Sequence, residues 1–318
     1  MQPPAFTDIL EAKRVVDRYL QPTPLHYYPR LSSLLGFSAF IKHENHQPIG
    51  SFKIRGGINL ISRLSEKERQ AGVIAASTGN HGQSVAYAAK LFGIRATIVV
   101  PDGANPDKVA SMRALGADVR FHGRDFDEAR IWCEEQAKAL GHRYIHSANE
   151  PLLIAGVGTI GLEILSAAPD IDTIIVPIGG GSTASGIAIA AKSINPGITI
   201  IGVQSEQAPA VYESWKAKKI ITSKKNDTFA EGMATRTAFG LTLDILIQHL
   251  DDFVLVSDQE LFNAIGDLFD HTHNIAEGAG AASFAAAMKM KDRLAGKKVA
   301  MDLSGGNITR ETLRRILN

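Results

Sequence analysis

The chain has 318 residues, of which 45% are hydrophobic and 21% are charged, so it can bury a large core and is not disordered. This length predicts roughly two domains at about 100 to 200 residues each. Lys and Arg total 34 against 33 Asp and Glu, which gives a net charge of +1. That balance argues against a nucleic-acid or membrane surface as the main partner and favours a small ligand.

Cys133 is the only cysteine, which excludes an internal disulfide and a multi-thiolate metal site. It lies in the amphipathic run 126–140, so we interpret it as a packing residue. No apolar run approaches the ~18 residues that a membrane span requires. Residues 1–10 lack the basic and apolar segments of a secretory signal, so we expect a cytoplasmic protein.

Short β-branched runs alternate with Ala-rich stretches along almost the whole chain. This pattern is typical of an α/β fold, in which a parallel sheet is covered by helices on both faces. The predicted strands are 74–76, 96–100, 119–122, 173–176, 198–203 and 299–303. The predicted helices include 83–92, 126–140 and 183–191.

Three of the predicted strands end in a short turn that contains glycine. These turns are 77–80 (Ser-Thr-Gly-Asn), 179–182 (Gly-Gly-Gly-Ser) and 304–307 (Ser-Gly-Gly-Asn). Ligands of open α/β sheets bind at the carboxyl ends of the strands. We therefore expect these turns to assemble a site.

The turn 179–182 follows an apolar strand and opens a helix. Its backbone amides and the helix dipole predict a cradle for an anion, most naturally a phosphate. The alternative is a tight turn that is packed for its own sake. Three glycines allow the backbone to approach the anion closely.

Gly179, Gly181 and Ala184 also fit the weak dinucleotide pattern G-x-G-x-x-A. That pattern requires an acidic residue about 20 positions further on, at the end of the next strand. Here the strand ends at Gln204, and Glu206 lies off the expected position. A ligand with one phosphate is therefore favoured over a nicotinamide cofactor.

Lys53 lies in the segment 50–57, where glycines flank a short apolar and basic stretch. If this lysine is buried, desolvation lowers its pKa and makes it a nucleophile suited to imine formation. Composition alone favours a solvated surface lysine.

Hydroxyls, an amide and an imidazole gather at a helix start in segment 77–82. The backbone amides there could hold a carboxylate. His81 either transfers a proton or only stabilises the turn. A phosphate cradle, an imine-forming lysine and a carboxylate-sized helix terminus together describe pyridoxal phosphate and an amino acid.

Other chemistry has little support in the sequence. His271 and His273 form a His-x-His pair, but no further ligand stands at a suitable spacing. The sequence contains no Gly-x-Ser-x-Gly elbow, no His-Glu-x-x-His helix and no Walker lysine. Hydrolase and kinase classes are therefore disfavoured.

In its motifs and their order, the sequence resembles the fold-type-II pyridoxal-phosphate enzymes, specifically the threonine/serine dehydratase and serine racemase group. The resemblance covers most of the chain and rests on Lys42, Glu44, Gln47, 51–56, 77–83, 155–163, 179–182, 277–281 and 304–307. It implies an architecture like that of the tryptophan synthase β subunit, with two open, mostly parallel sheets. It also implies a small domain at 49–145, a large cofactor-binding domain at 1–48 and 146–318, and a homodimer or higher homo-oligomer.

The resemblance assigns roles to individual residues. Lys53 holds pyridoxal 5'-phosphate as a Schiff base, and Phe52 packs beside the ring. The other cofactor contacts are Asn80 at the ring hydroxyl, Ser304 at the pyridine nitrogen, Glu277, and the phosphate loop of Gly179, Gly180, Gly181 and Ser182. The substrate carboxylate is expected at Ser77, Thr78, Gly79, Asn80 and His81.

The implied reaction is the β-elimination of L-threonine, and of L-serine, to a 2-oxo acid and ammonia. The substrate amine displaces Lys53, whose freed amine removes the Cα proton. The 3-hydroxyl then leaves as water, and the cofactor phosphate is the expected proton donor.

Three departures from the family pattern limit this assignment. Thr78 stands where the racemases place a catalytic serine; its hydroxyl remains, but racemisation is disfavoured. Gln204, Ala208 and Ala210 stand where the racemases bind a divalent cation, so no metal site is expected. The sequence ends 11 residues after Asn307, so a regulatory domain and feedback by a branched-chain amino acid are not expected, and a catabolic role is favoured.

Three alternatives remain open at this point. The first keeps the cofactor but acts as a serine racemase or a 3-hydroxyaspartate dehydratase, with Arg236 reaching a second carboxylate. The second is a non-catalytic binding module on the same fold. The third is a nicotinamide-dependent dehydrogenase.

Overall fold

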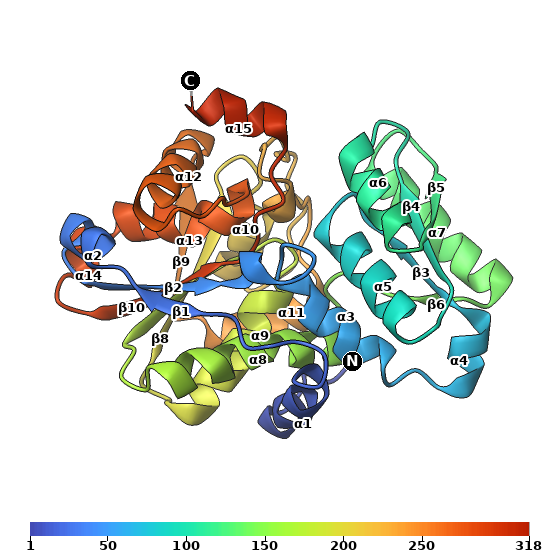
Figure 1. The fold of residues 1–318 in the computed structure, drawn as a ribbon, viewed down its shortest axis with the longest axis horizontal. Helices are drawn as coiled ribbons and strands as arrows, with labels where there is room; N and C mark the ends of the chain where they lie inside the picture. The colour runs from blue at the N-terminus through green and yellow to red at the C-terminus, as the bar shows by residue number, and fades with distance from the viewer. Residues whose placement is uncertain (318) are drawn as a thin grey trace.

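Two sheets organise the chain, one in each of the two bodies seen in Figure 1. The computed structural model describes residues 1–317, without the side chains of residues 127 and 317. The six-stranded sheet has the order β1-β2-β10-β7-β8-β9, and the four-stranded sheet has the order β5-β4-β3-β6. The larger sheet contains β1 (Leu25–Tyr27), β2 (Ser38–His43), β7 (Thr173–Pro177), β8 (Thr199–Ser205), β9 (Asp252–Val256) and β10 (Lys298–Leu303). The smaller sheet contains β3 (Val73–Ala76), β4 (Ala96–Val100), β5 (Asp118–Phe121) and β6 (Arg143–Tyr144).

The strand pairing confirms the predicted fold class. Among the described residues, the pair β1–β2 is antiparallel and all other paired strands are parallel. The central strand β7 is buried along its whole length, and so is β10 from Val299 onward. A parallel strand covered on both faces requires such a continuous apolar run, which is why these two strands could be predicted.

Helices cover the sheets and connect their strands. They are α1 (Phe6–Val16), α2 (Pro29–Leu35), α3 (Lys53–Ile61), α4 (Glu66–Ala71), α5 (Asn80–Leu91), α6 (Pro106–Ala114), α7 (Phe126–Leu140), α8 (Pro151–Ala167), α9 (Ser182–Ile194), α10 (Ala210–Ala217), α11 (Gly240–His249), α12 (Asp258–Thr272), α13 (Gly278–Lys289), α14 (Lys291–Leu294) and α15 (Arg310–Leu317). Two 3₁₀ helices are η1 (Glu44–His46) and η2 (Glu231–Met233). Cys133 of α7 is buried, and burial raises the pKa of its thiol to about 12, as expected of a packing residue.

Helix α3 lies where the two bodies meet (Figure 1), packed against α8 of the larger body and α5 of the smaller one. Every residue from Ile54 to Ile61 is buried, so the helix is enclosed almost all round. Lys53 is its first residue. The packing of α3 therefore fixes the start of this lysine side chain between the two bodies.

Four buried charged side chains hold α3 against its neighbours. Arg55 of α3 donates to Glu44 (Nε to Oε2, 2.8 Å) and to Glu163 of α8 (Nη1 to Oε1, 2.6 Å). Lys42 of β2 donates to the other oxygen of Glu163 at 2.5 Å. The four side chains are at most 5% exposed. We call them the buried charge cluster; its two cations and two anions balance.

Asp302 of β10 adds a fifth ionisable group beside this cluster. Its Cα pairs with that of Lys42, and its side chain is fully buried. Neither carboxyl oxygen has a hydrogen-bond partner among the described residues. Burial raises the pKa of Asp302 well above its usual value; Glu44 adds to this effect, and Lys42 and Arg55 oppose it. We infer that Asp302 is neutral in the folded protein.

A neutral Asp302 makes the stability of the protein depend on pH. Above about pH 4 the unfolded chain releases this proton while the folded chain keeps it, so the free energy of unfolding falls by about 1.4 kcal/mol per pH unit until the folded pKa is passed. We expect Asp302→Asn to lack this contribution of Asp302 to the pH dependence of the free energy of unfolding. Denaturant unfolding of both proteins from pH 4 to 8 measures it; a constant difference between them over that range would contradict a proton-holding Asp302.

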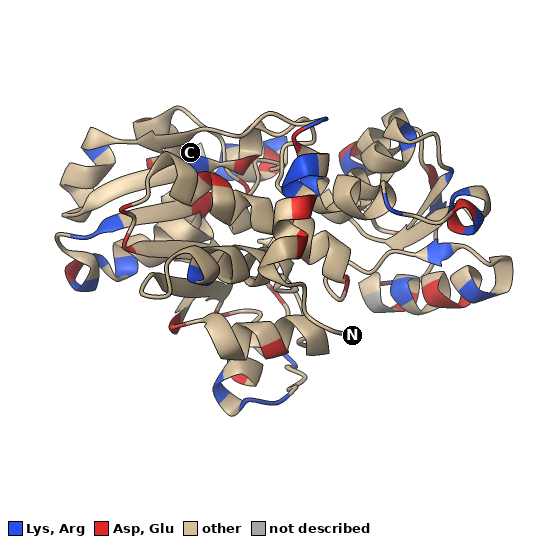
Figure 2. Ribbon diagram, turned by 90° about the horizontal axis from the view of Figure 1, so that it is seen from below, with Lys and Arg blue, Asp and Glu red and all other residues tan. Residues whose placement is uncertain are grey.

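Acidic and basic residues are interspersed along the ribbon of both bodies (Figure 2), in keeping with the net charge of +1. Such mixing gives the molecule little overall field. Across residues 1–317, no helix has the length and apolarity needed to cross a bilayer.

Candidate active site

A cavity of about 520 Å³ opens where the carboxyl ends of β3, β7 and β10 approach one another. Residues from both bodies line it. Every site residue predicted from the sequence lies on its wall: Phe52, Lys53, Ser77, Thr78, Gly79, Asn80, His81, Gly179, Gly180, Gly181, Ser182, Glu277 and Ser304. The structure thus brings three distant turns and the candidate lysine to one place. Arg236 also lines this cavity.

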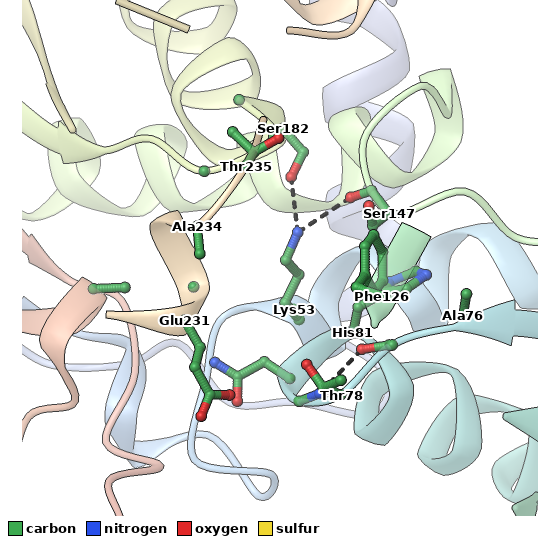
Figure 3. Close-up of a pocket in the computed structure, with 18 of the residues that line it drawn as sticks. Lys53, Ala76, Thr78, His81, Phe126, Ser147, Ser182, Glu231, Ala234 and Thr235 are labelled. Carbon is green, nitrogen blue, oxygen red and sulfur yellow. Dashed lines mark hydrogen bonds between the residues drawn. The ribbon is translucent and has the colours of Figure 1, made fainter. Parts of the chain in front are cut away.

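The amine of Lys53 points between two segments of the larger body (Figure 3). Nζ donates to Ser182 Oγ at 3.1 Å and to the carbonyl oxygen of Ser147 at 3.2 Å. It also lies 5.1 Å from the ring centre of Phe52. Burial lowers the pKa of Lys53 to about 8. A far larger share of this amine is unprotonated near neutral pH than in a solvated lysine, and the unprotonated form is the nucleophile.

The turn after β7 is built so that its backbone is open to an anion. It leads into α9, a helix of 13 residues, whose first amides have no partner within the helix. Gly181 has a φ of +89°, which favours glycine. A Cβ at Gly179 would overlap the carbonyl oxygen of Gly232. This geometry fits a phosphate group bound by backbone amides.

We expect Gly179→Ala to weaken cofactor binding by about 10-fold or more, because the added methyl group must displace the 232 carbonyl and distort the turn. Gly266→Ala in α12 is a matched control, since a Cβ there meets nothing within 4 Å. Titration of each apoprotein with pyridoxal phosphate gives the dissociation constants. Equal constants for both variants would show that the turn does not hold the phosphate.

A chain of hydrogen bonds joins three of the lining segments. Asn307 Nδ2 donates to Asn80 Oδ1 at 2.7 Å, and Asn80 Nδ2 donates to Glu277 Oε1 at 2.6 Å. Burial raises the pKa of Glu277, and Glu231 adds to this effect, while Asn80 and Lys108 oppose it. The amide of Asn80 is therefore held in one orientation from both sides.

Ser304 follows β10 and is almost fully buried on the cavity wall. Its carbonyl oxygen accepts from the Phe52 amide at 3.1 Å. An antiparallel bridge between Ser51 and Gly305 adds to this contact. The segment before Lys53 is thereby fixed to the end of the central strand.

The turn 77–79 leads into α5, and the first two residues of this helix, Asn80 and His81, line the cavity. The first amides of a helix have no partner within it. The hydroxyl of Ser77 accepts from the Gly79 amide at 3.2 Å. The buried His81 ring contacts the Ile145 carbonyl through Nε2 at 3.1 Å, so Nε2 carries the proton. Burial lowers the pKa of His81 to about 3, and the charge of Lys53 adds to this effect. These contacts favour the turn-stabilising interpretation of His81.

Several residues on the cavity wall were not predicted from the sequence, among them His146, Phe239, Lys108 and Glu231. Lys108 of α6 and Glu231 of η2 form an ion pair of 2.5 Å that connects the two bodies at the cavity. His146 follows the two-residue strand β6, which is too short to be recognised from its pattern. No local signal marks these residues, because the pairing of distant segments places them here.

The absence of a metal site, expected from the sequence, stays a prediction. Among the side chains that the structure describes, which do not include those of residues 127, 317 and 318, no group of three or more His, Cys, Asp or Glu is arranged to hold a metal ion. His273 is the left-handed cap of α12, with a φ of 58°. Gln204 Oε1 accepts from the amides of Val211 and Tyr212 at 3.1 and 3.0 Å, so this side chain caps the start of α10.

A lysine of lowered pKa beside a glycine-built anion cradle defines a site for pyridoxal phosphate. Residues 16–305 match a family model described as "Pyridoxal-phosphate dependent enzyme". The chain therefore belongs to the pyridoxal-phosphate-dependent enzyme family, and pyridoxal 5'-phosphate is its cofactor.

Individual relatives narrow the comparison. The L-threonine ammonia-lyase of Thermotoga maritima is 42% identical over 311 residues, which cover 98% of this chain and 77% of that protein. The structure of the processed form of threonine deaminase isoform 2 from Solanum lycopersicum is similar with a TM-score of 0.93 and 33% identity, over 99% of this chain and 94% of that one. Maize serine racemase gives a TM-score of 0.94 and 34% identity, over 99% and 97% of the two chains. These similarities confirm the predicted family.

Proposed function

We propose that this protein is a pyridoxal-phosphate-dependent ammonia-lyase that converts L-threonine, and also L-serine, to a 2-oxo acid and ammonia. The observation that carries the proposal is the 3.1 Å contact between Lys53 Nζ and Ser182 Oγ, at the end of the anion cradle where α9 begins. This closeness of the amine to the turn 179–182 supports Lys53 as the residue that would bind a cofactor whose phosphate is held by that turn. The names and high coverage of the relatives support the reaction type.

The parts of the site have separate tasks in this reaction, and Lys53 has two. Bound pyridoxal phosphate supplies the electron sink that stabilises negative charge at the substrate Cα. The turn 179–182 binds the phosphate, and Asn80 and Ser304 orient the ring. Lys53 anchors the cofactor through Nζ and, once displaced, accepts the Cα proton at the same atom. Burial lowers the pKa of Lys53 to about 8, so a larger share of this amine is unprotonated and able to accept that proton than in a solvated lysine.

The amides at the start of α5 are the proposed contacts of the substrate carboxylate. Five residues, Ser77, Thr78, Gly79, Asn80 and His81, form this turn and line the cavity. A helix start attracts negative charge, so the carboxylate fits there better than the substrate amine does. Thr78 brings a hydroxyl to the same wall.

The domain boundaries are proposed on the same basis. All four strands of the smaller sheet lie within residues 49–145, which supports a small domain over that range. The larger sheet is built from residues before 49 and after 145, which supports the large cofactor-binding domain. The homo-oligomeric state and the cytoplasmic location stay predictions.

Serine racemisation is the second candidate, because Thr78 brings a hydroxyl to the cavity where the racemases place a serine. The similarity to the structure of maize serine racemase supports it. Incubation with L-serine followed by chiral analysis separates the two reactions, and comparison with Thr78→Ser shows whether this hydroxyl limits racemisation.

An assay for 2-oxo acids tests the proposed function. The panel is L-threonine, L-serine, their D-forms and 3-hydroxyaspartate, each with the holoenzyme. We expect turnover of the two L-3-hydroxy amino acids. Product from 3-hydroxyaspartate alone would support the alternative with Arg236, and no 2-oxo acid from any substrate would refute the lyase.

A further inference from the structure

The ring of His146 is fixed in one orientation at the cavity wall. Its Nδ1 accepts hydrogen bonds from the backbone amides of Ala148 at 2.9 Å and Asn149 at 3.0 Å. The edge of the Phe239 ring packs against it, with centroids 4.7 Å apart. An amide N–H can only donate, so Nδ1 is unprotonated and the proton of the neutral ring must be on Nε2.

His146 stays neutral over the physiological pH range. Burial lowers its pKa to about 4; the charges of Arg130 and Lys53 add to this effect, and Glu134 opposes it. The side chain therefore presents an Nε2–H donor and carries no charge. A neutral donor suits a neutral acceptor such as a hydroxyl.

Within the described part of the chain, the hydrogen bonds of the His146 ring are made by Nδ1, and Nε2–H has no acceptor. His81 differs, because its Nε2 proton is used on the Ile145 carbonyl. His146 lines the cavity, and the carbonyl of the next residue, Ser147, accepts from Lys53 Nζ. The free donor is thus next to the segment that contacts the reactive amine.

We propose that His146 is a specificity residue whose Nε2–H donates a hydrogen bond to the 3-hydroxyl of the substrate. This inference rests on the proposed function. The substrate carboxylate has the amides of α5, and the substrate amine is directed to the cofactor at Lys53, which leaves the side-chain hydroxyl as the acceptor for His146. The imidazole keeps its proton, so it orients the hydroxyl and selects 3-hydroxy amino acids without proton transfer.

Two substitutions separate the donor from the loop contacts. In His146→Asn, the amide oxygen takes the place of Nδ1 and can accept from Ala148 and Asn149, but the distal donor is lost. In His146→Gln, the longer side chain places its NH₂ group near the original Nε2, whereas the loop contacts are lost. If His146 only supports the loop, kcat/KM for L-serine should fall less in His146→Asn than in His146→Gln. If Nε2–H binds the substrate hydroxyl, as proposed, it should fall less in His146→Gln.

The substrates L-serine and β-chloro-L-alanine complete the test, because chloride leaves without a proton and is a poor hydrogen-bond acceptor. We expect His146→Asn to lower kcat/KM for L-serine by about 10-fold or more, the size of one lost hydrogen bond, and to leave that for β-chloro-L-alanine little changed. The dissociation constant of pyridoxal phosphate should not change. An equal fall for both substrates, or weaker cofactor binding, would overturn the proposal.

A measurement without turnover checks the tautomer. In protein labelled with ¹⁵N-histidine, the resonances that disappear in His146→Asn belong to His146. We expect them to show a protonated Nε2 and a bare Nδ1 at about pH 7, since the pKa lies well below this value. A charged ring or a protonated Nδ1 would refute the inference even if the lyase is active, whereas an inactive wild type would refute the proposed function and leave the tautomer result valid.

Discussion

Replacement of Lys53 by alanine is expected to abolish the release of 2-oxo acid, with a fall in kcat of about 10⁴-fold or more. One amine is proposed both to anchor the cofactor and to accept the Cα proton, so its loss removes two functions at once. The Lys53→Ala protein should also lack the visible absorbance that pyridoxal phosphate shows when bound to a lysine. Absorbance spectra and a steady-state assay measure the two effects.

Lys108→Ala is the matched control for this experiment. Lys108 is also a lysine on the cavity wall, but its Nζ is paired with Glu231. We expect this variant to keep the visible absorbance. A Lys53→Ala protein that retains the absorbance, or a Lys108→Ala protein that loses it, would show that the cofactor is attached elsewhere.

Replacement of Arg55 by methionine is expected to lower the free energy of unfolding by about 3 to 5 kcal/mol. Methionine fills a similar volume, but it leaves Glu44 and Glu163 buried without their main counter-ion. Lys42 still contacts Glu163, whereas Glu44 keeps the hydroxyl of Thr23 as its hydrogen-bond donor. Denaturant unfolding at constant pH measures the loss.

Arg120→Met gives the comparison for an exposed pair. Arg120 and Asp118 are 46% and 58% exposed, so their ion pair should contribute about 0 to 1 kcal/mol. If Arg55→Met costs no more than Arg120→Met, the buried charge cluster does not stabilise the fold.

The parts of the site that were predictable are those encoded within a few consecutive residues. The turns at 77–80, 179–182 and 304–307 each follow an apolar strand, so their position at a sheet edge could be expected. Strands β7 and β10 are parallel neighbours in the larger sheet, so the turns at 179–182 and 304–307 were expected at the same edge. The turn at 77–80 follows β3 of the smaller sheet and meets them only because the two bodies pack together. Lys53 has no such local signal. It was identified only because the sequence also contains the glycine turns that a pyridoxal-phosphate site requires.

The rest depends on contacts between distant segments. Strand β2 ends in Lys42 and His43, two residue types that are usually exposed. Lys42 is buried because it pairs with the carboxylate of Glu163, which lies 121 positions further along the chain. Strands β1, β6 and β9 are short or partly exposed and carry a weak pattern. The Lys108–Glu231 pair and the free donor of His146 likewise appear only when the two bodies are placed together.

Lys53 and Arg55 are two positions apart on the same short helix, so reactive amine and buried guanidinium share one turn of backbone. We expect mutations that loosen the packing of this guanidinium to shift the amine as well, because both side chains start from the same turn of α3. Helix α3 thus carries both a residue that the fold needs and a residue that the reaction needs. We expect its sequence to change more slowly among relatives than most of the chain.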